Sequence, residues 1–154
     1  MAQPGPWSVK RLDEMQRAFG GALVRVRAEL GVSAFGLQVA ELPPDSKDLA
    51  PEHDHEHDGQ EEVYLLLAGS GEVVLDGTPV PLDLETFVRI GPRVRRRLRS
   101  GPDGARVLMI GAIPDRVYSP PPMTELGGPE TLAPAADSSL VNTNVNTSEE
   151  HCQT

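Results

Sequence analysis

Residues 55–69 read HEHDGQEEVYLLLAG: two histidines, an Asp-Gly turn, a pair of glutamates, and an apolar run that closes at a glycine. Another histidine lies two residues upstream, so that His53, His55 and His57 occupy every second position. Side chains alternate between the two faces of an extended strand. The three imidazoles therefore point to one face if this stretch is extended.

The Asp58-Gly59 pair predicts a turn, and the apolar run after it predicts a strand. Alternation then places Gln60, Glu62 and Tyr64 on one face of that strand. Two histidines spaced by one residue, with a carboxylate from the next strand, can converge on one divalent ion, because imidazole and carboxylate are good ligands for such ions. The alternative is a solvated acidic loop whose histidines bind nothing.

The spacing of these residues resembles the first motif of the cupin superfamily. That motif runs Gly, five residues, His-x-His, three or four residues, Glu, six residues, Gly. Leu49 stands where the motif has its first glycine, and the rest is matched by His55, His57, Glu62 and Gly69. The resemblance covers about residues 35–113. It implies a double-stranded β-helix, or jelly roll, that commonly binds one metal ion between its sheets.

Two histidine pairs are compatible with this resemblance. The first is His55 and His57, as in the motif above. Other small cupins that the chain resembles carry the pair earlier, which assigns His53 and His55, with Gln60 or Glu62 opposite them, and leaves His57 in a loop. A third arrangement uses all three histidines, and it is the one to look for first in a structure.

The second cupin motif is matched less well. It runs Gly, five residues, Pro-x-Gly, two residues, His, three residues, Asn, and in the family its histidine supplies the remaining metal ligand. Aligned with residues 90–100, it places Arg96 at the histidine position and Ser100 at the asparagine position. If Val94 and Leu98 turn inward, alternation turns Arg96 inward as well. We therefore predict one guanidinium inside the barrel.

Arginine is a permanent cation that cannot ligate a metal, and three roles for Arg96 follow. It could orient an acidic substrate by a bidentate contact, beside a metal held by two histidines and Glu62. It could pair with Glu62 in a cupin that has lost its metal. It could instead face solvent with the other arginines of residues 89–99, a run whose charges the acidic residues of 41–62 would neutralise.

Further segments with a period of two surround this stretch, at residues 23–27, 35–40, 60–68, 71–76, 86–91 and 106–113. Closely spaced strands with Gly- and Asp-rich turns predict an antiparallel sandwich or small barrel. Leu12 to Phe19 is weakly amphipathic and predicts a short helix that ends at Gly20-Gly21. The strand pattern predicts an all-β fold class, and the resemblance to cupins implies that it is a jelly-roll barrel, here with a short N-terminal helix and a disordered C-terminal tail.

We divide the chain into an N-terminal segment (1–22), the cupin barrel (23–118) and a Pro-rich, polar tail (119–154) that we expect to be largely disordered. The tail carries several Ser and Thr residues upstream of Cys152, as do precursor peptides whose hydroxyl residues are dehydrated and captured by a thiol. A minor alternative therefore makes the barrel a leader domain for its own tail.

Composition narrows the function further. Lys and Arg number 14 against 23 Asp and Glu, a net charge of −9, which disfavours nucleic acid because a phosphate backbone attracts basic surfaces. We also expect no membrane span and no signal peptide, and hence a cytoplasmic protein, because no apolar run approaches about 20 residues. Cys152 is the only cysteine, so nitrogen and oxygen atoms must hold any metal.

We therefore expect a metal-dependent cupin enzyme of the isomerase, dehydratase or dioxygenase type, with secondary metabolism as one setting and a homodimer as its assembly. Its metal would be Fe, Mn, Ni or Zn, bound by two of the three histidines and Glu62. A polar or anionic small molecule would be contacted by Arg96 and by Tyr64, whose alternative role is that of a core aromatic. A non-catalytic cupin that binds ligands or partners stays open as the competing function.

Overall fold

The computed structural model describes residues 5–130, and in them strands dominate. The strands are β1 (Arg17–Ala18), β2 (Leu23–Val24), β3 (Gly36–Leu42), β4 (Glu61–Leu75), β5 (Thr78–Leu82), β6 (Val88–Ile90) and β7 (Arg96–Ala112). The helical pieces are α1 (Val26–Leu30) and the 3-10 turns η1 (Leu12–Glu14), η2 (Phe19–Gly21) and η3 (Pro122–Thr124). The predicted all-β class is confirmed.

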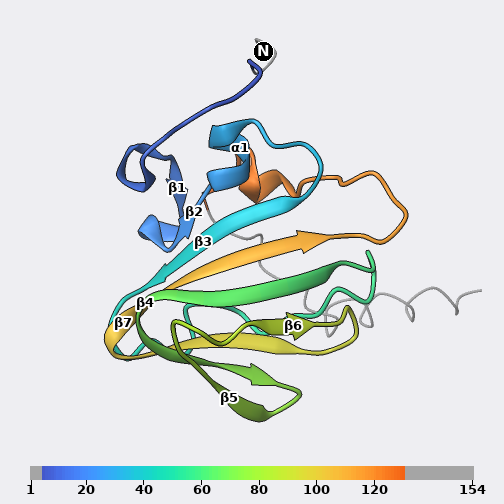
Figure 1. Ribbon diagram of the computed structural model, residues 1–154. Coiled ribbons are helices and arrows are strands. Elements are labelled where there is room, and N and C mark those ends of the chain that lie inside the picture. The colour runs from blue at the N-terminus through green and yellow to red at the C-terminus, as the bar shows by residue number, and fades with distance from the viewer. Residues whose placement is uncertain (1–4, 131–154) are drawn as a thin grey trace, which may run out of the picture.

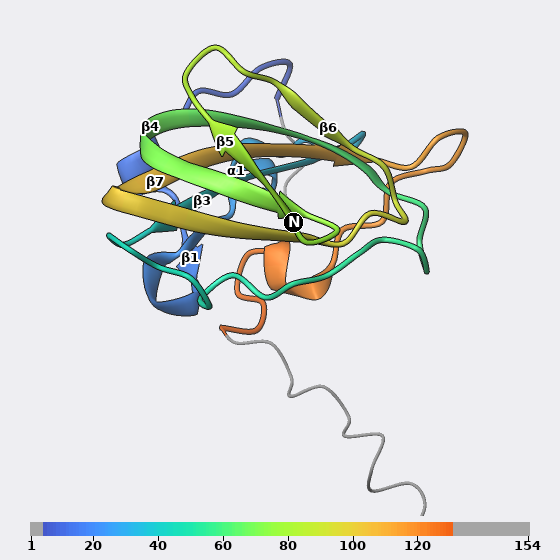
Figure 2. The same ribbon diagram turned by 90° about the horizontal axis from the view of Figure 1, so that it is seen from below.

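Two long strands, β4 and β7, organise the sheet. They pair antiparallel from Glu61 opposite Ala112 to Leu75 opposite Arg96, with irregularities between Leu66 and Gly71. The first part of β4 also pairs with β6, while β3 extends the second part of β7 and β5 extends the second part of β4. The sheet therefore bends over on itself, and its two halves lie one above the other (Figure 1, Figure 2).

Gly69, the last residue of the motif-bearing stretch, lies at the bend of β4. Its φ is +80°, and a Cβ atom there would lie 2.1 Å from the carbonyl oxygen of Gly104 in β7. Only glycine combines this backbone conformation with so close an approach of two strands. The glycine of the first cupin motif thus has a structural role in this chain.

Apolar side chains fill the space between the two halves. The most buried of them include Leu66 and Val73 from β4, and Leu98 and Val107 from β7. Each such side chain contributes about 1.5–3 kcal/mol when it leaves water. A second, smaller cluster forms where the N-terminal segment covers β3; its buried members are Met15, Val24, Val26 and Val39.

The predicted helix from Leu12 to Phe19 is wrong. The 3-10 turn η1 covers only Leu12–Glu14, η2 begins at Phe19, and Arg17 and Ala18 between them pair with β2. The predicted strand at residues 23–27 ends after Val24, and α1 begins at Val26 and stops at Gly31, whose φ is +79°. The short N-terminal helix therefore exists at other residues, because strand pairing outweighed a weak amphipathic pattern.

Strand β5 was not predicted. Its sequence TPVPL holds two prolines, which cannot donate to a neighbouring strand and are common at sheet edges. β5 pairs with β4 alone and forms one end of the strand order, so the prolines cost it no ladder hydrogen bonds on its free side.

The first part of the predicted tail, residues 119–130, packs against the N-terminal segment (Figure 1). The buried guanidinium of Arg25 donates to the carbonyl oxygens of Met123, Gly128 and Pro129 at 2.9–3.1 Å. An arginine can satisfy several carbonyl groups at once, which composition alone does not reveal. The predicted disorder of residues 131–154 and the precursor hypothesis for Cys152 lie outside the described residues. None of the helices within residues 5–130 is long and apolar enough to cross a membrane.

Candidate metal centre

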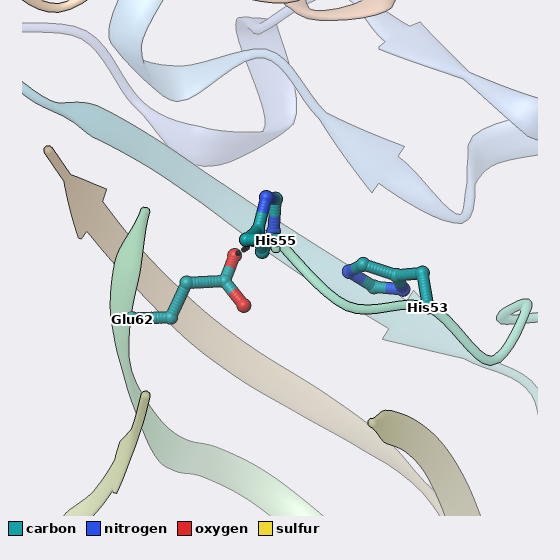
Figure 3. Close-up of side chains that lie close together, drawn as sticks. All are labelled: His53, His55 and Glu62. Carbon is teal, nitrogen blue, oxygen red and sulfur yellow. Dashed lines mark ion pairs between the residues drawn. The ribbon is translucent and has the colours of Figure 1, made fainter. Parts of the chain in front are cut away.

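The side chains of His53, His55 and Glu62 lie close together (Figure 3). Each offers one ligand atom, and these three atoms lie within 4.8 Å of one another. His53 exchanges two backbone hydrogen bonds with Arg96, at 2.8 and 3.0 Å, so the histidine segment lies beside the start of β7. Glu62 belongs to the other half of the sheet, where it pairs with Gly111 and Ile90. The cluster therefore bridges the two halves.

His57 is not part of this cluster. The chain turns directly after His55, whose carbonyl oxygen accepts the N–H of Gly59 at 2.7 Å. The alternation expected for an extended strand therefore stops at His55, and the side chain of His57 is 76% exposed. The structure therefore brings together the earlier pair, His53 and His55, and not all three histidines. The pair that matched the first cupin motif, His55 and His57, is separated by this turn.

The orientation of both imidazoles suits metal binding. His53 Nδ1 lies 3.0 Å from the carbonyl oxygen of Pro51, which can only accept, so this nitrogen carries the proton. His55 Nδ1 lies 3.2 Å from both carboxylate oxygens of Asp58. Because the Nδ1 atoms are held by acceptors, the Nε2 atoms are the ones free to ligate a metal.

His55 Nε2 is the clearest sign that the site suits an ion. This atom is buried without a hydrogen-bond partner in the described residues, and it lies 3.4 Å from Glu62 Oε1. Ligands of a tetrahedral ion with bonds of about 2.1 Å lie about 3.4 Å apart. Two imidazole nitrogens and a carboxylate oxygen form a donor set for Zn, Fe, Mn or Ni, so the residues fit a divalent metal.

The buried carboxylate of Glu62 is surrounded by donors. Oε1 accepts a hydrogen bond from Gln60 Nε2 at 3.2 Å, and Oε2 accepts one from the Tyr64 hydroxyl at 3.0 Å. Arg96 Nε lies 3.5 Å from Oε2. Burial raises the pKa of Glu62, but the hydrogen bond and charge of His55 and the charge of Arg96 outweigh it and lower the pKa below its usual value. Glu62 is therefore ionised at neutral pH and can serve as an anionic ligand.

The pKa values of the neighbouring groups follow the same balance. Burial lowers the pKa of His55, but Glu62 and Asp58 outweigh it, and the pKa of His55 is raised. Burial, followed by the charge of Glu62, raises the pKa of Tyr64 well above its usual value. Tyr64 thus keeps its proton at neutral pH and acts as a hydrogen-bond donor.

Arg96 lies inside the barrel with 0% of its surface exposed, so it does not face solvent. Its Nη2 donates to the carbonyl oxygen of Gly91 at 2.7 Å, while Nε and Nη1 have no hydrogen-bond partner in the described residues. The next arginines in the run form ion pairs on the outside: Arg95 with Glu52 at 3.1 Å, Arg97 with Asp48 at 3.5 Å and Arg99 with Glu72 at 3.7 Å. For Arg95 and Arg97 the partners come from the acidic stretch 41–62, as one reading of the sequence predicted, whereas the partner of Arg99 lies outside that stretch.

Two glycines make room for polar side chains near Glu62. Gly36, Gly111 and Glu62 lie side by side on β3, β7 and β4. A Cβ atom on Gly111 would lie 2.6 Å from Gln60 Nε2, and one on Gly36 would lie 2.7 Å from the Tyr118 hydroxyl. The roles of Asp58 and of these two glycines were not identified from the sequence. An acid three residues after a histidine indicates a contact between the two side chains only when a turn is known to lie between them.

Solved structures of three proteins share this architecture. A cupin protein from Bacteroides fragilis aligns with a TM-score of 0.58 and 18% identity, over 76% of this chain and 92% of its own. A sugar phosphate isomerase from a cupin superfamily, from Silicibacter pomeroyi, aligns with a TM-score of 0.56 and 19% identity, over 73% and 77%. The chain has a cupin superfamily fold. A protein from Planctomyces limnophilus aligns with a TM-score of 0.54 and 20% identity, over 77% of this chain and 96% of its own.

No family model matches the sequence, and no curated protein matches it. Identities of 20% or less to the solved structures establish the cupin fold and leave the activity to the site itself. Within that fold, this chain presents two histidines and a glutamate together, with a buried arginine beside the glutamate.

Proposed function

We propose that this cupin binds a divalent metal ion through His53, His55 and Glu62 and acts on a polar or anionic small molecule. The observation that carries the proposal is the buried Nε2 of His55, which faces Glu62 Oε1 at 3.4 Å and makes no well-directed hydrogen bond in the described residues. A buried polar atom whose hydrogen bond is poorly formed costs free energy unless a ligand satisfies it. A metal ion between the three side chains would do so.

A bound metal would supply Lewis acidity toward an oxygen atom of the small molecule. Three protein ligands leave coordination positions for that oxygen. His53 is exposed and His55 is partly buried, so a small molecule can reach the cluster from solvent. The isomerase, dehydratase and dioxygenase classes all fit a Lewis-acid or redox metal in such a place.

Tyr64 and Arg96 are proposed to act through Glu62. Their residue surfaces are 2% and 0% exposed, so a small molecule that arrives from solvent does not reach them in this arrangement. Both lie against Glu62 Oε2, so Oε1, whose one hydrogen bond comes from Gln60, keeps a lone pair for the metal. We expected Tyr64 and Arg96 to contact the small molecule. Because both side chains are enclosed, we propose instead that they position Glu62.

Metal analysis of the purified protein tests the proposal. The protein is stripped with a chelator, reconstituted with Mn, Fe, Ni or Zn, desalted, and measured by elemental mass spectrometry. We expect about one ion per chain, and a loss of that ion in His55→Ala and Glu62→Gln. His57→Ala is the matched control, because it removes an imidazole that is 76% exposed and outside the cluster; its Nε2 lies 3.6 Å from Asp58 Oδ2, so the comparison is of metal content and not of affinity. Equal metal content in the wild type and His55→Ala would remove the basis of the proposal.

A non-catalytic cupin without metal is the second candidate. The observation in its favour is the ion pair between Arg96 and Glu62, since a buried cation already neutralises the carboxylate that a metal needs. In this case none of the four metal ions binds with a dissociation constant below about 1 μM. The unfolding temperature of Glu62→Gln is then several degrees lower than that of the wild type, because Arg96 is left buried and unpaired.

The choice of small molecule can be narrowed with the metal-loaded protein. Sugar phosphates and carboxylic acids are the first compounds to screen by thermal shift, since they present anionic oxygens to a metal, and one structural neighbour is a sugar phosphate isomerase. A compound that acts through the metal raises the unfolding temperature of the loaded protein and leaves that of the stripped protein unchanged.

A further inference from the structure

We infer that Asp58 is a positioning residue for the metal: it fixes the His55 ring in the form that binds the ion and offsets the positive charge of Arg96. This inference rests on the proposed metal site of the preceding section. It concerns a residue that contacts no ligand itself and that the cupin motifs do not include.

The geometry of the turn holds Asp58 in place on two sides. Its Oδ1 and Oδ2 each lie 3.2 Å from His55 Nδ1. Oδ1 also accepts the backbone N–H of Gln60 at 3.1 Å, and the N–H of Asp58 donates to the carbonyl oxygen of His55 at 3.2 Å. The carboxylate cannot rotate away from His55 without losing Gln60 as well. Its position is therefore set by the turn and not by a flexible surface side chain.

The two imidazoles differ in what their Nδ1 atoms contact. His53 Nδ1 donates to a backbone carbonyl, whereas His55 Nδ1 contacts a full negative charge. A carboxylate behind a ligating histidine increases the basicity of the other ring nitrogen and fixes the ring orientation. His55 is also the more buried of the two rings, and its Nε2 faces Glu62 Oε1 at 3.4 Å without a well-directed hydrogen bond in the described residues. The charged carboxylate of Asp58 thus contacts His55, which is the more buried of the two histidines in the cluster.

A count of formal charges gives Asp58 a second role. A cupin with a neutral histidine at the second-motif position places only the metal and one glutamate in the site. Here Arg96 occupies that position and adds one positive charge beside Glu62, which weakens the binding of any cation. Asp58 adds one negative charge on the opposite side of His55. The net charge around the metal returns to the value it has with a histidine in place of Arg96.

The variant Asp58→Asn tests this inference against a matched control. Asparagine keeps an oxygen that can accept the N–H of Gln60 and removes the charge. Glu56→Gln is the control, because Glu56 is an exposed acid two residues away whose loss changes the net charge equally. Zinc affinity is measured by competition with a chromophoric chelator. Loss of a residue behind a metal ligand costs about 10- to 100-fold in affinity, whereas the control is expected to stay within about twofold, since charges in water are screened.

A nuclear magnetic resonance experiment on the zinc-loaded protein separates positioning from a structural effect. The His55 Nδ1 proton is expected as a downfield signal that exchanges slowly with water in the wild type and in Glu56→Gln. In Asp58→Asn it is expected to shift upfield and exchange faster, while the rest of the spectrum stays unchanged. If Asp58→Asn does not fold, Asp58→Ser retains a side-chain acceptor for the turn and replaces it.

The outcomes distinguish this inference from the proposed function. If the wild type binds zinc and Asp58→Asn binds it equally well, the role of Asp58 is overturned and the metal site stands. Equal weakening in Asp58→Asn and Glu56→Gln also overturns it, because general attraction by negative charge would then suffice. If the wild type binds no zinc, both the site and the role of Asp58 are rejected.

Discussion

Replacing Arg96 by histidine should convert this site into a stronger metal site. The metal has to share the charge of Glu62 with a guanidinium whose Nε lies 3.5 Å from Oε2. At an effective dielectric constant of about 20, that attraction is worth about 5 kcal/mol before the cost of burying the charges. If removal of the guanidinium makes the binding free energy of zinc more favourable by about 2 kcal/mol, Arg96→His binds zinc at least about 30-fold more tightly than the wild type. The new imidazole adds to this if it ligates the ion.

The assay is a chelator competition with zinc, repeated on Arg96→Met as the matched control. Methionine removes the cation and supplies no nitrogen, so the difference between the two variants measures the contribution of the new imidazole. Circular dichroism and thermal unfolding establish that both variants are folded. A folded Arg96→His that binds zinc no more tightly than the wild type would refute the reasoning, because the guanidinium would then have no influence on the charge of Glu62.

Three further predictions concern the scaffold. Gly69→Ala should destabilise the protein by at least about 3 kcal/mol, and Gly77→Ala by about 1 kcal/mol. Both glycines have a positive φ, but only Gly69 has a carbonyl oxygen 2.1 Å from its absent Cβ; equal effects in urea unfolding would contradict this explanation. Glu41→Gln should lose about 0.5–1 kcal/mol at pH 7, because its two partly exposed arginine partners outweigh burial and lower the pKa of Glu41. This contribution is present above the unfolded glutamate pKa of about 4.3 and is lost as the pH falls through the lower folded value, so the variant and the wild type should converge in acid; a constant difference would contradict it. Arg25→Met should accelerate hydrogen exchange in residues 123–130, because Arg25 donates to the carbonyl oxygens of Met123, Gly128 and Pro129. Exchange in β4 is the internal control. Unchanged exchange in residues 123–130 would show that other contacts hold this segment.

The sequence predicted the barrel well because its strands repeat with a period of two and are separated by glycine-rich turns. The inward position of Arg96 followed from the same alternation, and the structure buries both Arg96 and Leu98. The approach of Glu62 to the histidines followed from the spacing of the first motif. These features depend on local periodicity, which a single sequence displays directly.

The identity of the clustered histidines could not be decided in the same way. Alternation treats His53, His55 and His57 as equivalent, but the turn begins after His55, and its hydrogen bonds to Asp58 and Gly59 break the period. The helix at Leu12 to Phe19 failed for a similar reason, since the pairing of Arg17 with Val24 depends on a partner strand that the local pattern does not contain. Both differences arise where contacts between segments decide the local conformation.

The course of folding follows from the way β4 and β7 run through both halves of the sheet. Strands β4 and β7 belong to both halves, and the pairing of Gly36 with Gly111 joins residues that are far apart in the sequence. Such distant contacts are slow to form, because the chain loses entropy before the contacts stabilise it. We therefore expect closure of the barrel to be a late, cooperative step. The histidines lie beside one half and Glu62 belongs to the other, so a metal ion finds all three side chains together only after closure, and cannot guide the early stages of folding.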